Sequence, residues 1–491
     1  MEQHITNEMH RKSGQVVRSI LAVTAILTSA GAPPGLAFDD DANTTVSVAD
    51  YGAKGDGITD DTAAIQAAIN AITSGTVVFP VTASCYRSGN VLISNKSNFT
   101  FDGNNQTICW FGTAPTGNLI GIQYSGHLTN VTIQRLTLVG DGILGNAHAG
   151  VWGLSGAVLT NFRVVSNRIS NVTLGVSINA ASGGTIDGFE VAENLIDTIV
   201  GTSPGHYGIH HANGSGSPSN GMIRDNTVLR AQRHSIYQAM GSGVVIEYNR
   251  ILSHRKDVPA VPGSPLPAIE VARSSNILVQ HNTVDQAKDG SLGVSNTAGH
   301  ICADIIVSDM LITNPVGPFQ PITVGTTDPA TDGICTNVTI SKANISYGFA
   351  GSNPAVQIYT GKNITVSDST IVATSSAGNG SVFQVRGVGE GVGTSTYTDY
   401  ISFRCNSVQA SKTGGELHAV LLFGTTPASA IRMSFIHDVF DVPDDDFLLG
   451  GALTDPNISV CSTPTVGLLP VLLKPVAPED CTCPPDPIPI R

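Results

Sequence analysis

A short segment that recurs along most of the chain constrains its fold more than any other feature of the sequence. In the typical copy, alternating apolar residues are followed by a polar residue, often Asn, and then by Val or Ile, as in Phe189–Ile196 and Ile277–Val284. With the polar position as a marker, the copies fall at residues 136, 167, 194, 226, 249, 282, 310, 343, 369, 406 and 436, and the ten steps average 30 residues. Period-two alternation is typical of strands, whereas coiled coils and helical repeats place apolar residues about every 3.5 residues.

Copies of this kind are expected to stack on one another. One coil cannot bury its inner face alone, so its stability comes from its neighbours along the axis. The sequence therefore predicts an all-β fold in which a parallel β-helix, or solenoid, of about 11 or more coils spans residues 81–462. A β-sandwich built from hairpins is the alternative, and the scarcity of two-residue Asn-Gly turns between the strands disfavours it.

The first strand edge of such a stack needs a cover. Within the segment 38–80, residues 60–73 carry Ile65, Ile69 and Ile72 on one helical face, with acidic residues in front of them. Acidic side chains cap the N-termini of helices. We therefore predict a helix over 60–73 that caps the N-terminal end of the solenoid.

The same region carries a resemblance to a known group of proteins. Residues 48–69 read Val-Ala-Asp-Tyr-Gly-Ala-Lys-Gly-Asp-Gly-Ile-Thr-Asp-Asp-Thr-Ala-Ala-Ile-Gln-Ala-Ala-Ile, and residues 75–80 read Gly-Thr-Val-Val-Phe-Pro. This closely resembles the opening of pectate-lyase-superfamily proteins, a group of lyases, glycoside hydrolases, epimerases and phage tailspikes. The resemblance implies a right-handed parallel β-helix. It implies no single reaction, because this scaffold hosts many activities.

The two ends of the chain differ in composition from the repeats. Basic residues precede the apolar run Ile20–Ala30, and small residues follow as far as Ala37, which is the order of a secretory signal. We predict a signal peptide over 1–37 and a secreted or periplasmic protein. An uncleaved membrane anchor is the alternative, but the run is too short to span a bilayer, so we expect no membrane association after cleavage. Residues 463–491 are rich in Pro and should form a tail outside the strand ladders.

The charge of the chain limits its partners. The formal net charge is -13, and no block rich in Lys and Arg occurs, which argues against nucleic acid. A polysaccharide substrate, acidic in character, remains compatible with this charge, because cations gathered at one place matter more than the net charge. The sequence is compatible with both a monomer and a trimer.

The eight cysteines suit an oxidising compartment, with buried free thiols as the alternative. No cysteine or histidine pattern has the spacing of a zinc site, so we predict no metal site and no required cofactor. Asp441–Asp446 keeps calcium (Ca2+) open as an alternative to a solvated acidic turn, although this stretch lacks the spacing of an EF-hand.

Aligned coils bring unusual residues together near the middle of the chain. We expect the apolar residues of three successive coils to point inward, namely Ile209, Ile236 and Ile269. The residues after them then form an outward column about 4.8 Å apart, namely His210, Tyr237 and Glu270. Two positions before the inward residues, a second column holds Tyr207 and His234.

The lengths of the coils point to the same place. The coil between the markers 226 and 249 is the shortest, at 23 residues, and both neighbouring coils are longer. The extra residues around 198–206 and 254–267 are expected to form walls beside a groove near residues 206–270. Polar groups that converge in such a cleft suggest catalysis.

This cluster suits removal of the C5 proton of a uronate, the step that β-eliminating lyases and C5-epimerases share. The site must neutralise the sugar carboxylate and place a base on one face of the ring. Arg233 or a protonated histidine is expected to neutralise the carboxylate, and His210 or Tyr207 to act as the base. Tyr237 or His234 is expected to act as the acid, and Glu270 completes the catalytic set. The expected substrate-binding residues are His206, His211, Arg273 and Lys288.

Two short stretches are similar to mannuronan C5-epimerases, which carry Tyr-Gly-x-Asp-Pro-His on one coil and an Arg-or-Lys-His-Gly sequence on the next. Here Tyr207-Gly-Ile is followed by His210-His211, and the next coil carries Arg233-His-Ser. His210 stands where that family has Asp, and the Pro is absent. An acidic role at this position therefore does not carry over.

Two other functions stay open. A glycoside hydrolase needs two carboxylates, and Glu270 with Asp225, Asp285 or Asp289 is the candidate pair, although the motifs of polygalacturonases are absent. A non-catalytic glycan-binding or adhesive solenoid would carry many stacked aromatic residues, which make up only 5% of this chain. A single histidine on a solenoid strand is often only a solvated residue. The gathering of four of the 13 histidines within 29 positions favours a site.

Overall fold

The computed structural model describes residues 44–460 and 473–475, apart from the segments 114–117, 144–146, 181–182, 202–204, 214–217, 260–265, 298, 318, 326–332, 350–352, 376–379, 388–397, 414–416, 425–431, 437, 443–446 and 452–456. The predicted signal peptide lies outside the described residues. So do nearly all of the predicted Pro-rich tail and most of the acidic stretch 441–446.

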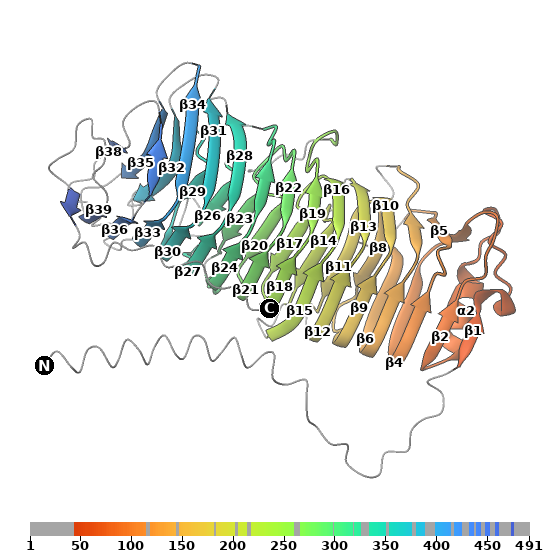
Figure 1. Cartoon of the computed structure of the whole chain (residues 1–491). Helices are drawn as coiled ribbons and strands as arrows, with labels where there is room; N and C mark the ends of the chain where they lie inside the picture. Colours follow the sequence, from red (N-terminus) through yellow and green to blue (C-terminus); the bar gives the residue numbers. More distant parts are fainter. Residues whose placement is uncertain are drawn as a thin grey trace, which may run out of the picture. The chain divides into compact units, whose positions relative to one another are not determined.

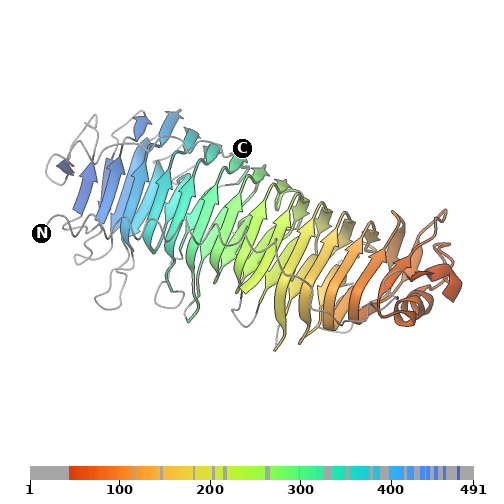
Figure 2. The same ribbon diagram turned by 60° about the horizontal axis from the view of Figure 1, so that its bottom comes forward.

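Three parallel ladders of strands run along the chain, and each coil contributes one strand to each ladder, as Figures 1 and 2 show. The strand pairs β14–β17, β15–β18 and β16–β19 illustrate the parallel pairing of the three ladders. The first two ladders merge into one sheet of 27 strands because the long strands β4 and β6 run through both, and the third is a separate sheet of 13 strands. The predicted parallel β-helix of 11 or more coils is confirmed.

The sheet of 27 strands begins with four strands, namely β1 (Thr45–Ser47), β2 (Gly75–Val78), β4 (Val91–Asp102) and β6 (Ile120–Gln134). The first ladder then consists of β8 (His148–Gly153), β11 (Leu174–Asn179), β14 (Ile209–Ala212), β17 (Ile236–Ala239), β20 (Ile269–Ala272), β23 (Leu292–Ser295), β26 (Ile322–Val324), β29 (Val356–Ile358), β32 (Gly380–Gly387), β35 (Leu417–Gly424) and β38 (Phe447–Gly451). The second ladder consists of β9 (Val158–Val165), β12 (Thr185–Ala192), β15 (Pro218–Arg224), β18 (Ser242–Glu247), β21 (Ser275–Gln280), β24 (Ala303–Ser308), β27 (Thr336–Ser341), β30 (Gly361–Ser367), β33 (Thr398–Arg404), β36 (Arg432–Ile436), β39 (Asn457–Val460) and β40 (Leu473–Pro475).

The third ladder consists of β3 (Tyr86–Ser88), β5 (Thr107–Trp110), β7 (Thr137–Val139), β10 (Arg168–Val172), β13 (Leu195–Ile199), β16 (Thr227–Ala231), β19 (Arg250–Leu252), β22 (Thr283–Asp285), β25 (Leu311–Thr313), β28 (Asn344–Phe349), β31 (Thr370–Ser375), β34 (Ser407–Lys412) and β37 (Val439–Asp441). In most coils the second residue after the marker is Val or Ile and falls on this ladder, and Ile196, Val228 and Val284 are fully buried there. Inward apolar residues of all three ladders form one continuous core along the described chain. Each fully buried Val or Ile contributes about 1.5–3 kcal/mol relative to exposure.

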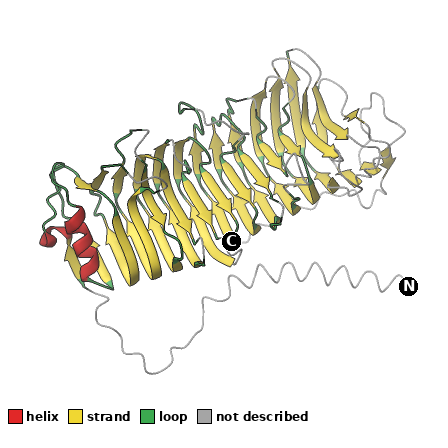
Figure 3. Cartoon of the chain, turned by 180° about the vertical axis from the view of Figure 1, so that it is seen from behind, coloured by secondary structure: helices red, strands yellow, loops and turns green. Residues whose placement is uncertain are grey.

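Helix α2 (Thr62–Ala71) lies at the end of the stack that begins with β1 and β2, after a short 3-10 helix (Val48–Tyr51), as Figure 3 shows. The helix is shorter than predicted, because Ile72 already has an extended backbone. Asp61 does not cap it; its carboxylate accepts hydrogen bonds from the backbone N–H groups of Lys54 (2.7 Å) and Gly55 (3.0 Å). Asp60 instead accepts from the backbone N–H of Thr62 at 3.0 Å.

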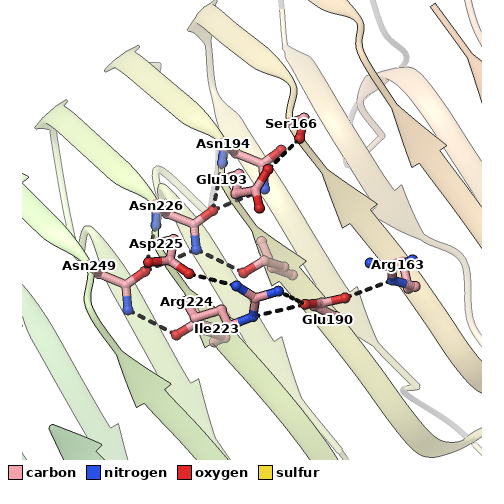
Figure 4. Close-up of polar contacts among 11 residues, drawn as sticks. Arg163, Ser166, Glu190, Glu193, Asn194, Ile223, Arg224, Asp225, Asn226 and Asn249 are labelled. Atoms are coloured by element: carbon pink, nitrogen blue, oxygen red, sulfur yellow. Dashed lines mark hydrogen bonds and ion pairs between the residues drawn. The ribbon is translucent and has the colours of Figure 1, made fainter.

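The marker asparagines form a buried ladder at one corner of the coils, drawn in part in Figure 4. The Nδ2 of Asn194 donates to the carbonyl oxygen of Val164 (2.9 Å) and to the Oδ1 of Asn226 (3.0 Å), which also accepts from the backbone N–H of Asn194. The residue before each Asn has a left-handed backbone, as in Glu193 with φ of 59°. The Asn side chain thus satisfies the backbone of a sharp turn, as the repeat predicted.

The last marker was misplaced by the sequence pattern. Asn406 donates from its backbone N–H (2.9 Å) and its Nδ2 (2.8 Å) to the Oδ1 of Asp438, so the ladder continues at 438 and not at 436. The alternation of this copy is weak, and an Asp in place of the Asn hid the true position.

Two disulfides, Cys85–Cys109 and Cys302–Cys335, join neighbouring coils. Cys405 is also disulfide-bonded, and no cysteine in the described part of the chain is free. Within the same residues, no helix is long and apolar enough to cross a membrane.

Candidate active site

The central coils align as the sequence predicted. On adjacent strands β14, β17 and β20 (green in Figure 1), His210 pairs in register with Tyr237, and Tyr237 with Glu270. The residues before them, Ile209, Ile236 and Ile269, are fully buried in the core. We call His210, Tyr237 and Glu270 the outer column; its predicted geometry is confirmed, while the roles of its residues stay predictions.

Four rings from two coils stack against one another, and two of them belong to the outer column. The ring of Tyr207 lies 5.1 Å from that of His210 and 5.0 Å from that of Tyr237, measured between centroids. The ring of His234 lies 4.9 Å from that of Tyr237. We call these four residues the aromatic cluster. Stacked rings of this kind hold one another in fixed orientations.

A glycine makes the bend that brings Tyr207 onto this face. A Cβ atom at Gly208 would lie 2.5 Å from the carbonyl oxygen of Ser235 in the next coil, so only glycine fits. The backbone N–H of Gly208 donates to the carbonyl oxygen of His234 at 3.0 Å. This close contact lets the turn before β14 direct Tyr207 to the same side as His210.

His210 is held by one hydrogen bond and two rings. Its Nδ1 lies 3.0 Å from the Oγ of Ser177, and no hydrogen bond to its Nε2 is found among the described residues. Burial, together with the charges of Arg273 and Arg233, lowers the pKa of His210 to about 4. The imidazole is therefore neutral near pH 7, and one ring nitrogen is left for a ligand.

His234 is held by a hydrogen bond to the next coil. Its Nδ1 donates to the carbonyl oxygen of Pro267 at 2.8 Å, which fixes the neutral tautomer with the lone pair on Nε2. Burial lowers the pKa of His234 to about 3. A protonated histidine therefore does not fit the expected neutralisation of a sugar carboxylate, because burial disfavours the charged form of both histidines.

Two arginines contact different members of the aromatic cluster. The guanidinium carbon of Arg233 lies 5.2 Å from the centroid of the Tyr207 ring, which is the range of a cation–π contact. The Nη2 of Arg273 donates to the hydroxyl oxygen of Tyr237 at 3.0 Å. Burial raises the pKa of Tyr207, although the charge of Arg233 opposes this effect. Both guanidinium groups bring positive charge to a site whose histidines are neutral.

Glu270 is buried at the end of the outer column. Ser295 donates its hydroxyl proton to the Oε1 of Glu270, and the other oxygen lies over Gly293, where a Cβ atom would be 2.2 Å from it. Burial raises the pKa of Glu270 to about 7, and the hydrogen bond from Ser295 and the charge of Arg273 only partly offset this effect. A fraction of Glu270 is therefore protonated at neutral pH, so it can donate a hydrogen bond.

Two of the predicted substrate-binding residues lie apart from the aromatic cluster. His211 is fully buried: its ring stacks on Phe189 with centroids 4.5 Å apart, and its Nδ1 lies 2.8 Å from the Oε1 of Gln238. Because strand residues alternate in direction, His211 points into the core and cannot contact a glycan there. Lys288 is exposed in the turn between β22 and β23, and no interaction with the aromatic cluster is found among the described residues.

His206 is buried at 7% exposure, and neither ring nitrogen has a hydrogen-bond partner in the described part of the chain. Burial and then the charge of Arg233 lower the pKa of His206. Of the four predicted substrate-binding residues, only Arg273 shares a hydrogen bond with the aromatic cluster.

Two serines were missed by the sequence analysis. Ser177 lies next to His210 in the register of the first ladder, and Ser295 contacts Glu270. Ser177 could have been found, because extending the alignment of inward apolar residues one coil back, to Val176, places Ser177 beside His210. Nothing in the sequence around Ser295 marks it out.

The other candidate carboxylates are engaged outside the aromatic cluster. Asp225 is ion-paired with Arg224 on the second ladder, and Asp285 accepts from the hydroxyl of Thr313. Asp289 is buried and ion-paired with Arg255. In the described residues, no three His, Cys, Asp or Glu side chains gather closely enough to hold a metal ion. Residues 202–204 and 260–265, which belong to the predicted walls, lie outside the described residues, so the groove stays a prediction.

Comparison with known sequences identifies related proteins. Residues 45–290 match the sequence model of the family described as rhamnogalacturonase A/epimerase, pectate lyase-like. Over 131 residues, the chain is 30% identical to depolymerase 1, capsule K30/K69-specific, of Klebsiella phage K5-2; this covers 27% of the chain and 16% of the relative. The match thus spans less than a fifth of that relative's length.

Comparison with solved structures identifies the same fold. The tailspike protein gp49 of Pseudomonas phage LKA1 superimposes with a TM-score of 0.54 at 12% identity, covering 84% of each chain. The catalytic unit of the GH87 α-1,3-glucanase from Streptomyces thermodiastaticus strain HF3-3 gives a TM-score of 0.51 at 18% identity, covering 86% of this chain and 69% of the other. At these identities the likeness extends to the fold and not to the site.

Proposed function

Because this chain belongs to the rhamnogalacturonase A/epimerase, pectate lyase-like family, we propose that it is a polysaccharide-active enzyme that removes the C5 proton of a uronate residue. The observation that carries the proposal is a neutral histidine, His210, whose ring stacks on Tyr207 and Tyr237. Arg233 lies near the first of these rings, and Arg273 bonds to the hydroxyl of the second. A uronate offers matching chemistry, because its carboxylate needs positive charge and its C5 proton needs a base.

In this proposal His210 is the base. The proposal requires the tautomer in which Nδ1–H donates to the Oγ of Ser177, 3.0 Å away, so that the lone pair lies on Nε2. The low pKa of His210, about 4, keeps the imidazole unprotonated and ready to accept the C5 proton near neutral pH. General bases of this kind contribute about 10²–10⁴-fold to rate.

Arg273 and Arg233 would neutralise the sugar carboxylate as negative charge develops on it. A guanidinium can bind a carboxylate with two parallel hydrogen bonds. Glu270, held partly neutral by burial, adds a proton donor that can bond to the same carboxylate without repelling it. This support for the carboxylate lowers the barrier to removing the neighbouring proton.

Tyr237 is the group best supported as the acid. Its hydroxyl accepts a hydrogen bond from Arg273 and remains able to donate its own proton. An elimination delivers this proton to the leaving oxygen of the glycosidic bond, whereas an epimerisation delivers a proton to the opposite face of C5. Both outcomes use the same base and the same neutralised carboxylate.

A glycoside hydrolase is the second candidate, and one observation favours it. The raised pKa of Glu270, about 7, is typical of the acid of such enzymes. A hydrolase also needs a second carboxylate, and none is free near the aromatic cluster among the described residues, since Asp289 is ion-paired with Arg255. A glycan-binding protein without catalysis is the third candidate.

One experiment separates these candidates. The purified protein is incubated with a panel of acidic polysaccharides, and His210→Ala serves as the matched inactive control. Absorbance near 235 nm identifies the unsaturated product of a lyase, and changed uronate signals in NMR spectra identify an epimerase. New reducing ends without that absorbance identify a hydrolase and contradict the proposal. Binding without any chemical change identifies a glycan-binding protein and contradicts it as well.

We also propose that the protein is secreted. The leader-like composition of residues 1–37 and the disulfides Cys85–Cys109 and Cys302–Cys335 support this. Expression of the full chain followed by N-terminal sequencing of the extracellular protein tests it. A protein that retains residues 1–37 inside the cell would contradict the proposal.

A further inference from the structure

One aromatic residue extends the outer column beyond the aromatic cluster. Trp152, on β8, pairs in register with Gln123 on one side, and the pairing of β8 with β11 aligns Val151 with Val176. Since Ser177 follows Val176 and pairs with His210, Trp152 occupies the same outward position two rungs from His210. Two rungs correspond to about 10 Å along the axis, roughly the length of a disaccharide.

The coil of Trp152 carries a glycine in the same register as the coils of the site. Gly208 has counterparts at Gly175 and Gly150, one and two coils earlier. A Cβ atom at Gly175 would lie 2.3 Å from the carbonyl oxygen of Gly208, and one at Gly150 would lie 2.5 Å from that of Gly175. The surface that carries His210 therefore continues without a break in backbone geometry to Trp152.

Trp152 and Tyr207 share an apolar support. Leu119, Ala149 and Leu174 form a small buried cluster separate from the main core, and both Trp152 and Tyr207 pack against it. Trp152 is only partly buried, and the residue between it and His210, Ser177, is small. An indole ring is thus held firmly on the outer face, with no bulky side chain of the column between it and the base.

We propose that Trp152 forms a sugar-binding subsite, which stacks on the apolar face of a glycan residue on the N-terminal side of the reacting uronate. Sugar rings expose a face of C–H groups, and aromatic rings offer large, rigid apolar area for such a face. The inference rests on the proposed function, because it takes His210 as the reacting centre. Under this inference the glycan lies along the coil axis, and the enzyme binds more than one sugar residue.

The chain holds two tryptophans, and this makes a direct test possible. Trp110 is buried at 2% exposure, so a ligand on the surface perturbs the emission of Trp152 alone. Oligomers of galacturonate and of mannuronate, two to six residues long, are titrated into the inactive variant His210→Ala, and emission and calorimetric heat are followed together. The same titration with His210→Ala/Trp152→Phe shows which signal comes from Trp152.

The expected result is a change in emission for the longer oligomers that saturates with the calorimetric heat and disappears in the double variant. In the active enzyme, Trp152→Ala is expected to raise KM for long substrates about threefold to tenfold, with little change for the shortest substrate that reacts. Tyr248→Ala is the matched control: Tyr248 is an exposed aromatic residue at the Asn corner, 51% accessible, and its loss is expected to leave KM unchanged.

The two proposals fail in different ways. Calorimetric binding without any change in Trp152 emission overturns the subsite and leaves the proposed function standing. An equal rise in KM for the shortest and the longest substrates also overturns the subsite. Absence of binding and of turnover with every oligomer overturns the proposed function and the subsite with it.

Discussion

The asparagine ladder and the outer column both present one residue per coil, yet they are built in opposite ways. From Asn167 to Asn282 the ladder repeats one residue type in five successive coils, and each side chain bonds to its neighbour and to the backbone. The outer column, His210, Tyr237 and Glu270, changes residue at every coil, and Ser177 precedes it in the same register. In the described part of the chain, the Nε2 of His210 has no hydrogen-bond partner and stays available to a ligand.

The difference shows how one scaffold separates stability from chemistry. Identical asparagines give identical hydrogen bonds, so every rung stabilises the same turn. In the outer column, burial shifts the pKa of His210 down and that of Glu270 up, which works against the charged forms. The raised pKa of Glu270 lowers stability as pH rises toward 7. Perturbed groups of this kind cluster at functional sites.

Removal of the base should give the largest effect. His210→Ala is expected to lower kcat about 10²–10⁴-fold, since a positioned base contributes that much. The temperature of unfolding should fall only modestly, because the ring is partly exposed and its contacts are one hydrogen bond and two stacked rings. The matched control is His281→Ala, which removes an exposed histidine that stacks on Tyr248 at 4.8 Å. Equal losses of kcat in both variants would contradict the assignment of His210.

Removal of one ladder asparagine should act on stability and not on chemistry. Asn226→Ala deletes the hydrogen bonds from Nδ2 to the carbonyl oxygen of Val191 (2.8 Å) and from the backbone N–H of Asn194 to Oδ1 (3.0 Å). Groups left buried without partners cost about 1–3 kcal/mol each, so the free energy of unfolding should fall by about 2–4 kcal/mol. Urea denaturation measures this loss. A variant as stable as the parent but with a reduced kcat would reverse the comparison between ladder and column.

The outer column should also control the pH dependence of activity. The base works only when His210 is neutral, so kcat/KM should rise with pH through about 4, the lowered pKa of His210. If neutral Glu270 supports the sugar carboxylate, kcat/KM should fall again above about 7, the raised pKa of Glu270. Glu270→Gln cannot ionise and should remove the alkaline limb, which is expected to amount to about tenfold. If the alkaline limb persists unchanged in this variant, a group other than Glu270 causes it.

The smallest effect concerns the one acidic residue that joins the asparagine ladder. Burial raises the pKa of Asp438 to about 6, and its Oδ2 has no partner among the described residues. The protonated form is favoured in the folded state, so its contribution to stability is present below the unfolded pKa and is lost as pH rises through 6. Asp438→Asn should therefore stabilise the protein by about 1–2 kcal/mol at pH 8 and by much less at pH 4. Thermal unfolding at both values tests this; equal shifts at both would exclude the ionisation of Asp438 as the cause.

By itself, the sequence determined the coil. Period-two alternation dictates which residues face the core, and Asn can satisfy a sharp turn in each coil, so the parallel β-helix and the register of His210, Tyr237 and Glu270 followed from local pattern alone. The same alternation directs His211 inward, next to His210, which opposes its predicted role in substrate binding. At Asp438, where Asp replaces the repeating Asn, the local signal failed.

Only the tertiary structure decided how the site is held and charged. Ser177 meets His210 from 33 residues away, and Arg273 bonds to Tyr237 from 36 residues away, through spacings set by loops of unequal length. The low pKa of His210 and the high pKa of Glu270 arise from burial, which depends on every neighbouring coil at once. Alternation is a local property of the strand, whereas desolvation and contacts between coils exist only after the chain has stacked.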